Sequence, residues 1–201
     1  MSALDRFYLI VDHTDWLKKL LPVGVKLVQL RIKDRPLDEV RAEVVLARDL
    51  CRAAGAQLIV NDYWRIALDE GCDFIHLGQE DLREADLTAI RAAGVKLGVS
   101  THDDAELETA LAVEPAYVAL GPVWPTILKK MPWAPQGVEK VTAWKRRIGP
   151  VPLVAIGGLT PERGRAVWAA GAESAAVVTD VLRAENPVAR VREWLAAAGA
   201  A

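Results

Sequence analysis

The chain has few of the features that mark secreted, membrane or nucleic-acid-binding proteins. It has only two cysteines, Cys51 and Cys72, which form neither a CxxC pair nor a zinc-binding spacing. No apolar run approaches the roughly 18 residues of a membrane span, and the run FYLIV near the N-terminus is too short for a signal-peptide core. The formal net charge of −2 supplies no basic field for nucleic acid. These absences favour a cytoplasmic protein that binds neither membranes nor nucleic acid.

The residues that are present suit a folded domain with a large core. Apolar residues make up 52% of the 201 positions and charged residues 26%, a composition that argues against disorder. Short apolar runs alternate with segments of helical periodicity, several of which end in glycine. The predicted strands lie at residues 7–11, 27–31, 57–60, 74–78, 96–100, 117–121, 152–157 and 174–179.

Eight strands, each followed by a helix, predict a single-domain (β/α)8 TIM barrel over residues 1–201. The alternative is a doubly wound open sheet, but no GxGxxG motif follows the first strand. In a barrel of this kind, the functional residues lie at the carboxyl ends of the strands and in the loops that follow. Polar residues at those places are therefore the candidates for a site.

Cations follow the second predicted strand. Gln29 and Arg31 share one face of the strand, and Lys33 continues that parity into the loop. Together they could bind an anion and hydrogen-bond a heterocycle at the barrel mouth. The alternative is an ordinary solvated strand end, with these cations paired to Asp34 or Asp38.

Carboxylates follow the third and fourth predicted strands. Asn61 and Asp62 end one strand and Asp81 follows the next, so both acids face the same mouth. Mg²⁺ is commonly held by one or two carboxylates together with waters and substrate phosphates, which makes a magnesium site a candidate. The alternatives are a helix cap for Asn61 and Asp62 and a turn for Asp81. His76, inside the fourth strand, is expected to belong to the core.

Hydroxyls and glycines follow later strands. Ser100 and Thr101 end the fifth strand, where a helix cap is the alternative to a binding role. Gly157 and Gly158 follow the seventh strand, where barrels often bind phosphate through backbone N–H groups. Two adjacent glycines also occur in ordinary tight turns. Their place after the seventh strand is what makes phosphate binding a candidate here. Two anion sites at one mouth suggest two phosphorylated ligands.

The longest predicted loop runs from residue 122 to residue 136. It contains the sequence PVWPTILKKMPWAPQ, with four prolines, two tryptophans and two adjacent lysines. Loops of this length inside compact domains are usually functional or disordered. We expect this one to be a lid over the mouth.

Six segments resemble the thiamine phosphate synthase family in its proteobacterial form. They are QLRIKD, NDYWR, HLGQEDL, LGVSTHD, ALGPVWPT with the following APQG, and VAIGGL, in order from about Tyr8 to Thr179. The resemblance implies a Mg²⁺-dependent transferase of thiamine biosynthesis. Its small-molecule substrates are hydroxymethylpyrimidine diphosphate and hydroxyethylthiazole phosphate, and its products are thiamine phosphate and diphosphate. In the family the diphosphate leaves first, and the thiazole nitrogen captures the resulting pyrimidine cation.

The resemblance also implies which residues form the site. The pyrimidine-diphosphate site falls on Gln29, Arg31, Lys33, Asn61, Ser100 and Lys129; the Mg²⁺ ligands fall on Asp62 and Asp81; and the thiazole-phosphate site falls on Thr126, Leu128, Gly158, Val178 and Thr179. Arg31, Lys33, Lys129 and Ser100 are the expected catalytic residues. One position departs from the family, because Leu128 stands where a second threonine is usual and cannot donate a hydrogen bond.

Two other functions stay open from the sequence. A related thiazole tautomerase uses a histidine at the end of the sixth strand, where this chain has Pro122. A non-catalytic barrel that binds phosphate ligands is compatible with Leu128. A homo-oligomer is also compatible with the sequence.

Overall fold

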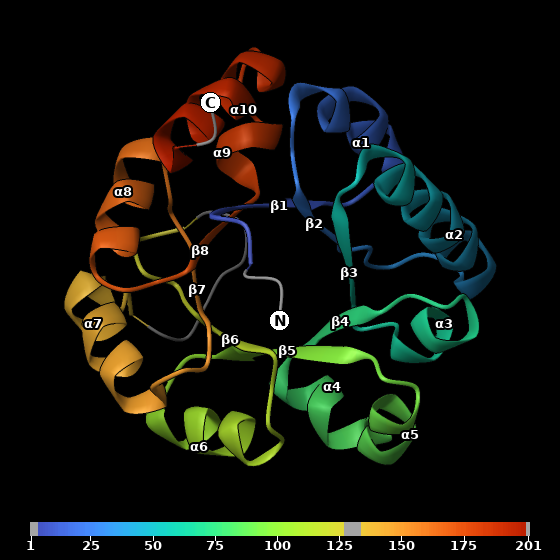
Figure 1. The fold of residues 1–201 in the computed structure, drawn as a ribbon, viewed down its shortest axis with the longest axis horizontal. Helices are drawn as coiled ribbons and strands as arrows, with labels where there is room; N and C mark the ends of the chain where they lie inside the picture. Colours follow the sequence, from blue (N-terminus) through green and yellow to red (C-terminus); the bar gives the residue numbers. More distant parts are fainter. Residues whose placement is uncertain (1–3, 127–133, 200–201) are drawn as a thin grey trace.

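Eight parallel strands form a closed barrel in the computed structural model, which describes residues 4–126 and 134–199 (Figure 1). Each strand pairs with the next one along the chain, and the last strand pairs with the first in the register Phe7↔Ala175 to Leu9↔Val177. Closure confirms the predicted TIM barrel and excludes the open, doubly wound alternative.

The strands lie where the apolar runs predicted them, with ends that differ by at most two residues. They are β1 (Phe7–Val11), β2 (Leu27–Leu30), β3 (Gln57–Asn61), β4 (Phe74–Leu77), β5 (Lys96–Thr101), β6 (Tyr117–Leu120), β7 (Leu153–Ile156) and β8 (Ser174–Val177). Several strands stop just before a glycine. Gly157, for example, has a φ of 99°, which takes the backbone out of the extended conformation.

Helices surround the barrel as an outer ring (Figure 1). They are α1 (Thr14–Leu20), η1 (Leu21–Val23), α2 (Leu37–Ala54), α3 (Trp64–Asp69), α4 (Gln79–Glu84), α5 (Leu87–Ala92), α6 (Asp104–Ala112), α7 (Gly137–Ile148), α8 (Pro161–Ala169), α9 (Thr179–Leu182) and α10 (Pro187–Ala198). Gly55 is one of the glycines that end helical segments: it follows α2 with a φ of 61°, and its N–H donates to the carbonyl groups of Arg52 and Cys51.

The strands divide their side chains between two apolar layers. Phe7, Leu9 and Val11 of β1 pack outward against the helices, whereas Tyr8 and Ile10 point into the barrel. The interior layer comprises Tyr8, Ile10, Leu27, Ile59, Phe74, Tyr117, Ala119, Val154 and Ala176. Both tyrosines therefore bring hydroxyl groups into an otherwise apolar interior.

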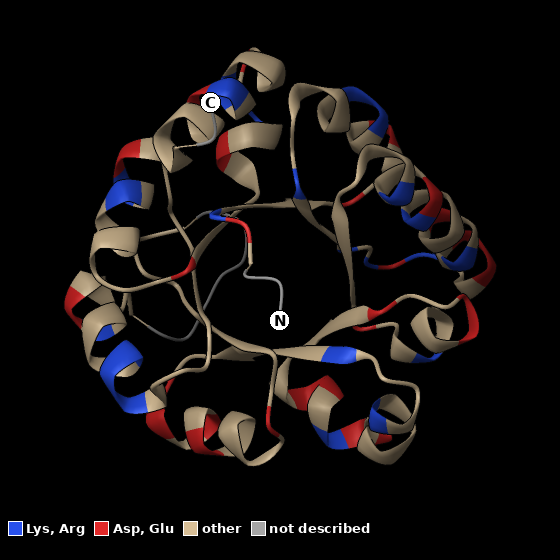
Figure 2. Cartoon of the chain, viewed as in Figure 1, with Lys and Arg blue, Asp and Glu red and all other residues tan. Residues whose placement is uncertain are grey.

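Acidic and basic residues are interspersed along the outer helices (Figure 2). This distribution agrees with the small net charge and offers no single-sign field for a polyanion. Among the residues described, no helix has the length and apolar character that crossing a bilayer would require.

Gly98 and Tyr117 pair across β5 and β6, and they leave no room for a side chain at residue 98. A Cβ there would lie 2.2 Å from Cζ of Tyr117. We expect Gly98→Ala to destabilise the protein by about 1–3 kcal/mol, as overpacking of a core does. Thermal and chemical denaturation would measure the loss.

A double-mutant cycle identifies the cause of that loss. In a Tyr117→Ala background the ring is absent, so Gly98→Ala should cost much less than in the wild type. An equal loss in both backgrounds would show that the ring contact is not responsible.

Candidate functional site

A cavity of about 540 Å³ opens at the carboxyl ends of the strands. It is lined by every predicted site residue that the structure describes, namely Gln29, Arg31, Lys33, Asn61, Asp62, Asp81, Ser100, Thr126, Gly158, Val178 and Thr179. Leu128 and Lys129 lie outside the described residues. The fold thus brings residues from distant parts of the sequence to one site.

The end of β2 places three polar side chains along one wall of the cavity. Gln29 is buried, with 3% of its surface exposed, and Arg31 follows it at the mouth. The backbone N–H of Arg31 donates to the carbonyl of Val11 at 2.8 Å, which extends the pairing with β1 beyond the strand itself. Lys33 forms an ion pair with Asp62 across the mouth, rather than with Asp34 or Asp38.

Asp62 adopts a backbone conformation that is uncommon for a residue with a side chain. Its φ is 64°, and its N–H donates to the carbonyl of His76 at 2.9 Å. The next helix, α3, has Tyr63 at its cap position and no side-chain cap bond, so Asp62 does not cap it. Strained residues of this kind concentrate at functional sites, which agrees with a binding role for this carboxylate.

Asp81 lies in the first turn of α4 and interacts with Asp62. Burial raises the pKa of Asp81, and the negative charge of Asp62 raises it further. Two neighbouring carboxylates are a donor set that a divalent cation would stabilise. Among residues 4–126 and 134–199, no three acidic, histidine or cysteine side chains gather as a metal site. A two-carboxylate site nevertheless fits Mg²⁺, which takes its remaining ligands from water and phosphate.

The opposite wall of the cavity is a close backbone turn after β7. Gly158 has a φ of 64°, and a Cβ there would lie 2.4 Å from the carbonyl oxygen of Pro125. Arg163 donates to the Gly158 carbonyl at 2.5 Å, and its guanidinium lies over the ring of Trp124. The turn is therefore packed from both sides, and only glycine fits it. Thr126, Val178 and Thr179 line the cavity beside this turn.

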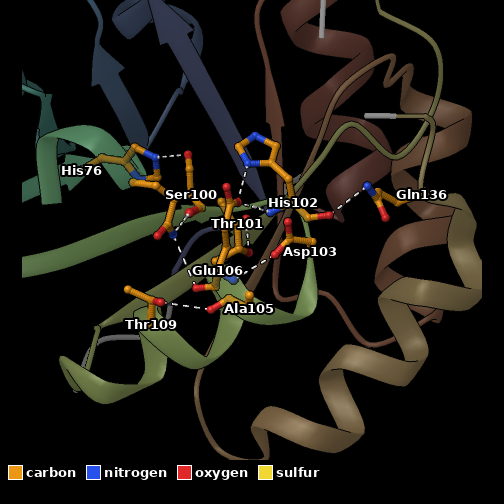
Figure 3. A network of polar contacts seen from close by, with 11 residues as sticks. His76, Ser100, Thr101, His102, Asp103, Ala105, Glu106, Thr109 and Gln136 are labelled. Carbon is orange, nitrogen blue, oxygen red and sulfur yellow. Dashed lines mark hydrogen bonds and ion pairs between the residues drawn. The ribbon is translucent and has the colours of Figure 1, made fainter. Parts of the chain in front are cut away.

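The two ends of the predicted lid loop are joined to each other. The N–H of Gln136 donates to the Pro122 carbonyl at 2.8 Å, and the N–H of Gly137 donates to the Val123 carbonyl at 3.0 Å. The Gln136 side chain donates to the carbonyl of His102 at 3.0 Å (Figure 3). Residues 127–133 of this loop lie outside the described part of the chain, so the lid stays a prediction.

Ser100 sits at the end of β5 in a polar network (Figure 3). Its Oγ lies 2.7 Å from Nε2 of His76, and its carbonyl accepts a 2.7 Å hydrogen bond from Gln79. The helix that follows is capped by Asp103, whose side chain accepts from the N–H of Glu106. Capping is thus done by Asp103, and the Ser100 side chain is turned toward the cavity instead.

His76 connects Ser100 to two tyrosines that the sequence analysis did not select. Nδ1 of His76 lies 2.7 Å from the Tyr117 hydroxyl, which lies 3.0 Å from the Tyr8 hydroxyl. Gln29 donates to the Tyr8 hydroxyl at 2.7 Å. The sequence did contain a signal, because the alternation of side chains along β1 and β6 places both tyrosines on the inward faces of these strands. The sequence analysis missed it because the other residues of both strands are apolar.

Burial keeps this network neutral. Burial is the largest cause that lowers the pKa of His76 to about 4, and it outweighs the opposing effect of the Asp62 charge. Burial also raises the pKa of both Tyr8 and Tyr117, although the hydrogen bond with Gln29 lowers the pKa of each. Both His76 nitrogens are engaged with protein groups, so His76 belongs to the core network, as expected, and not to a metal site.

The sequence profile of the family described as thiamine monophosphate synthase matches residues 7–181. The chain belongs to this family. It is 68% identical to the thiamine-phosphate synthase of Rhizobium etli over 96% of this chain and 95% of that one. It is 48% identical to the thiamine-phosphate synthase of Salmonella typhimurium over 96% of this chain and 91% of that one.

A solved structure agrees with this assignment. The thiamine phosphate pyrophosphorylase of Pyrococcus furiosus is 26% identical and superposes with a TM-score of 0.86, covering 97% of this chain and 96% of the other. The resemblance seen in the six sequence segments is thus confirmed. Membership of the thiamine monophosphate synthase family makes the chain a transferase of thiamine biosynthesis.

The two carboxylates provide a direct test of the site's electrostatics in this thiamine monophosphate synthase family member. We expect Asp62→Asn to lower the pKa of Asp81, because the negative charge that opposes its ionisation is removed. Titration of the carboxyl ¹³C resonances would measure the shift. Glu84→Asn, on the same helix but outside the cavity lining, is the control and should leave the Asp81 pKa in place. An unchanged pKa in Asp62→Asn would show that the two carboxylates do not interact.

Proposed function

We propose that the protein condenses hydroxymethylpyrimidine diphosphate with hydroxyethylthiazole phosphate, in the presence of Mg²⁺, to give thiamine phosphate and diphosphate. The observation that supports the proposal is one cavity lined both by the cations after β2 and by the glycine turn after β7, each of which could hold an anion. Cations and carboxylates line it at the ends of β2, β3 and β4, and a tightly packed glycine turn lines it after β7. Two phosphorylated substrates would be held there side by side.

The pyrimidine diphosphate fits the β2 to β4 side. Arg31 and Lys33 would bind its phosphate oxygens, because charge-assisted hydrogen bonds are the strongest that side chains offer an anion. Asp62 and Asp81 would hold Mg²⁺, which when bound neutralises charge on a departing diphosphate. Lys33 pairs with Asp62 in the structure, so it already lies next to the place where the metal and the diphosphate would meet.

The thiazole phosphate fits the β7 to β8 side. Gly158 permits close approach of backbone N–H groups to a phosphate, and Thr179 lies at the start of α9 beside it. Thr126 offers a hydroxyl from the loop after β6, while Leu128 offers none. A dissociative reaction needs its leaving group stabilised and water excluded, and it needs no protein nucleophile.

Formation of thiamine phosphate from the two substrates and Mg²⁺, by purified protein, is the decisive experiment. Product formation that depends on both substrates would support the proposal. Isomerisation of a thiazole alone would favour the tautomerase, although Pro122 lines the cavity where that enzyme needs a histidine. Binding of both ligands without turnover would make the protein a non-catalytic barrel.

The metal assignment predicts the effect of removing either acid. Asp62→Ala and Asp81→Ala should each lower turnover by about 100-fold or more at ordinary Mg²⁺ concentrations, since several kcal/mol of charge stabilisation is lost. Circular dichroism should show both variants folded. Glu84→Ala is the matched control on α4 and should keep its activity. Near-normal turnover in both aspartate variants would refute the metal site.

Arg31 tests whether the two anion places are separate. Arg31→Ala should weaken pyrimidine-diphosphate binding by about tenfold or more, the scale of one hydrogen bond to a charged group, and leave thiazole-phosphate binding nearly unchanged. Isothermal titration with each ligand would measure both affinities. Arg35→Ala removes an exposed cation from the same loop, outside the cavity lining, and should change neither. Equal losses for both ligands in Arg31→Ala would contradict two separate places.

A further inference from the structure

Five side chains from five strands form a continuous chain of hydrogen bonds through the barrel interior. In order they are Gln29 on β2, Tyr8 on β1, Tyr117 on β6, His76 on β4 and Ser100 on β5, with successive distances of 2.7, 3.0, 2.7 and 2.7 Å. The first four are buried, and all five line the cavity. The chain therefore runs along the floor of the proposed active site.

Counting donors and acceptors gives this series of hydrogen bonds a single direction of donation. The Gln29 amide N–H can only donate, so the Tyr8 oxygen accepts from it and the Tyr8 proton goes to Tyr117. The Tyr117 proton then goes to Nδ1 of His76. His76 must in consequence carry its own proton on Nε2 and donate it to the Ser100 oxygen.

The opposite direction leaves a buried proton without an acceptor. If Tyr117 donated to Tyr8, then Tyr8 would accept from both of its neighbours, and its own proton would have nowhere to go. Within the described ranges 4–126 and 134–199, the Tyr8 hydroxyl has hydrogen bonds only to Gln29 and Tyr117. Tyr8 is 1% exposed, so a hydroxyl proton without either partner would carry the cost of an unsatisfied buried group.

We propose that Gln29 sets the direction of this chain, that Tyr8, Tyr117 and His76 transmit it as positioning residues, and that Ser100 thereby presents its hydroxyl proton to the cavity. The Ser100 oxygen is occupied as an acceptor for His76, so its proton is available to an acceptor atom of the substrate. The bond from Gln79 holds the Ser100 backbone in place. The direction rests on geometry alone, whereas the contact with pyrimidine diphosphate rests on the proposed function.

Nitrogen NMR reports the direction without any variant. The protein has three histidines, so labelling with ¹⁵N-histidine gives a spectrum of three imidazoles. The resonances that disappear in His76→Gln are those of His76. The expected result for free wild-type protein at neutral pH is a neutral His76 ring protonated on Nε2. Protonation on Nδ1, or on both nitrogens, would overturn the proposal. Because no substrate is needed, this result is independent of whether the protein makes thiamine phosphate.

Two tyrosine variants test the transmission. Tyr117→Phe removes the donor to Nδ1 and should replace the single Nε2–H signature with a mixture of tautomers. Tyr8→Phe removes the hydroxyl that links Gln29 to Tyr117, so it should give a mixture of tautomers as well. A wild-type Nε2–H signature in Tyr8→Phe would show that Gln29 does not set the direction. Tyr63→Phe lies outside these hydrogen bonds and is the control that should keep the signature, and circular dichroism would report any general loss of packing.

Kinetics then test the contact with substrate. Tyr117→Phe should raise the KM for pyrimidine diphosphate about tenfold and leave the KM for thiazole phosphate unchanged, because only the Ser100 donor is affected. Tyr63→Phe, which alters the one other tyrosine and lies outside the cavity lining, is the control for activity. If Tyr117→Phe retains either the wild-type tautomer or the wild-type KM for pyrimidine diphosphate, transmission to the substrate is refuted.

Discussion

The pairing of β1 with β8 is the constraint on which the position of every candidate residue depends. It closes a parallel sheet into a barrel, and closure turns the carboxyl ends of all eight strands toward one cavity. In an open sheet, the cations after β2 and the glycine turn after β7 would lie toward different parts of the sheet. Closure brings the cations after β2 and the glycine turn after β7 to one cavity, where the two proposed phosphorylated substrates would meet.

The interior of the barrel balances apolar packing against a polar chain. Most interior side chains are aliphatic, yet Tyr8, Tyr117 and His76 carry polar groups into this layer. They are tolerated because each polar atom has a partner, which avoids the cost of an unsatisfied buried group. The absence of a side chain at Gly98 is what allows the Tyr117 ring to take its place. The packing of the Tyr117 ring against Gly98 therefore also fixes the position of the Tyr117 hydroxyl.

Much of the site could be predicted because a parallel barrel converts sequence position into spatial position. The alternation of side chains along β2 points Gln29 into the barrel and its neighbours Val28 and Leu30 toward the helices. The polar residues that follow β3 and β4 lie at the same end of the barrel, because the strands are parallel. The network of Tyr8, Tyr117 and His76 was not predictable in the same way. Those residues lie in the middle or at the beginning of strands, where a tyrosine in an apolar run has the same pattern as any core aromatic.

The sequence by itself determined the order of strands and helices, the barrel and the residues at each strand end, because these follow from local periodicity and from glycine positions. Only the tertiary structure decided which polar groups meet. Lys33 pairs with Asp62, and His76 lies between Tyr117 and Ser100, across distances of 29, 41 and 24 residues along the chain. Such contacts depend on side-chain distances and donor counts across several strands, and no local pattern contains that information.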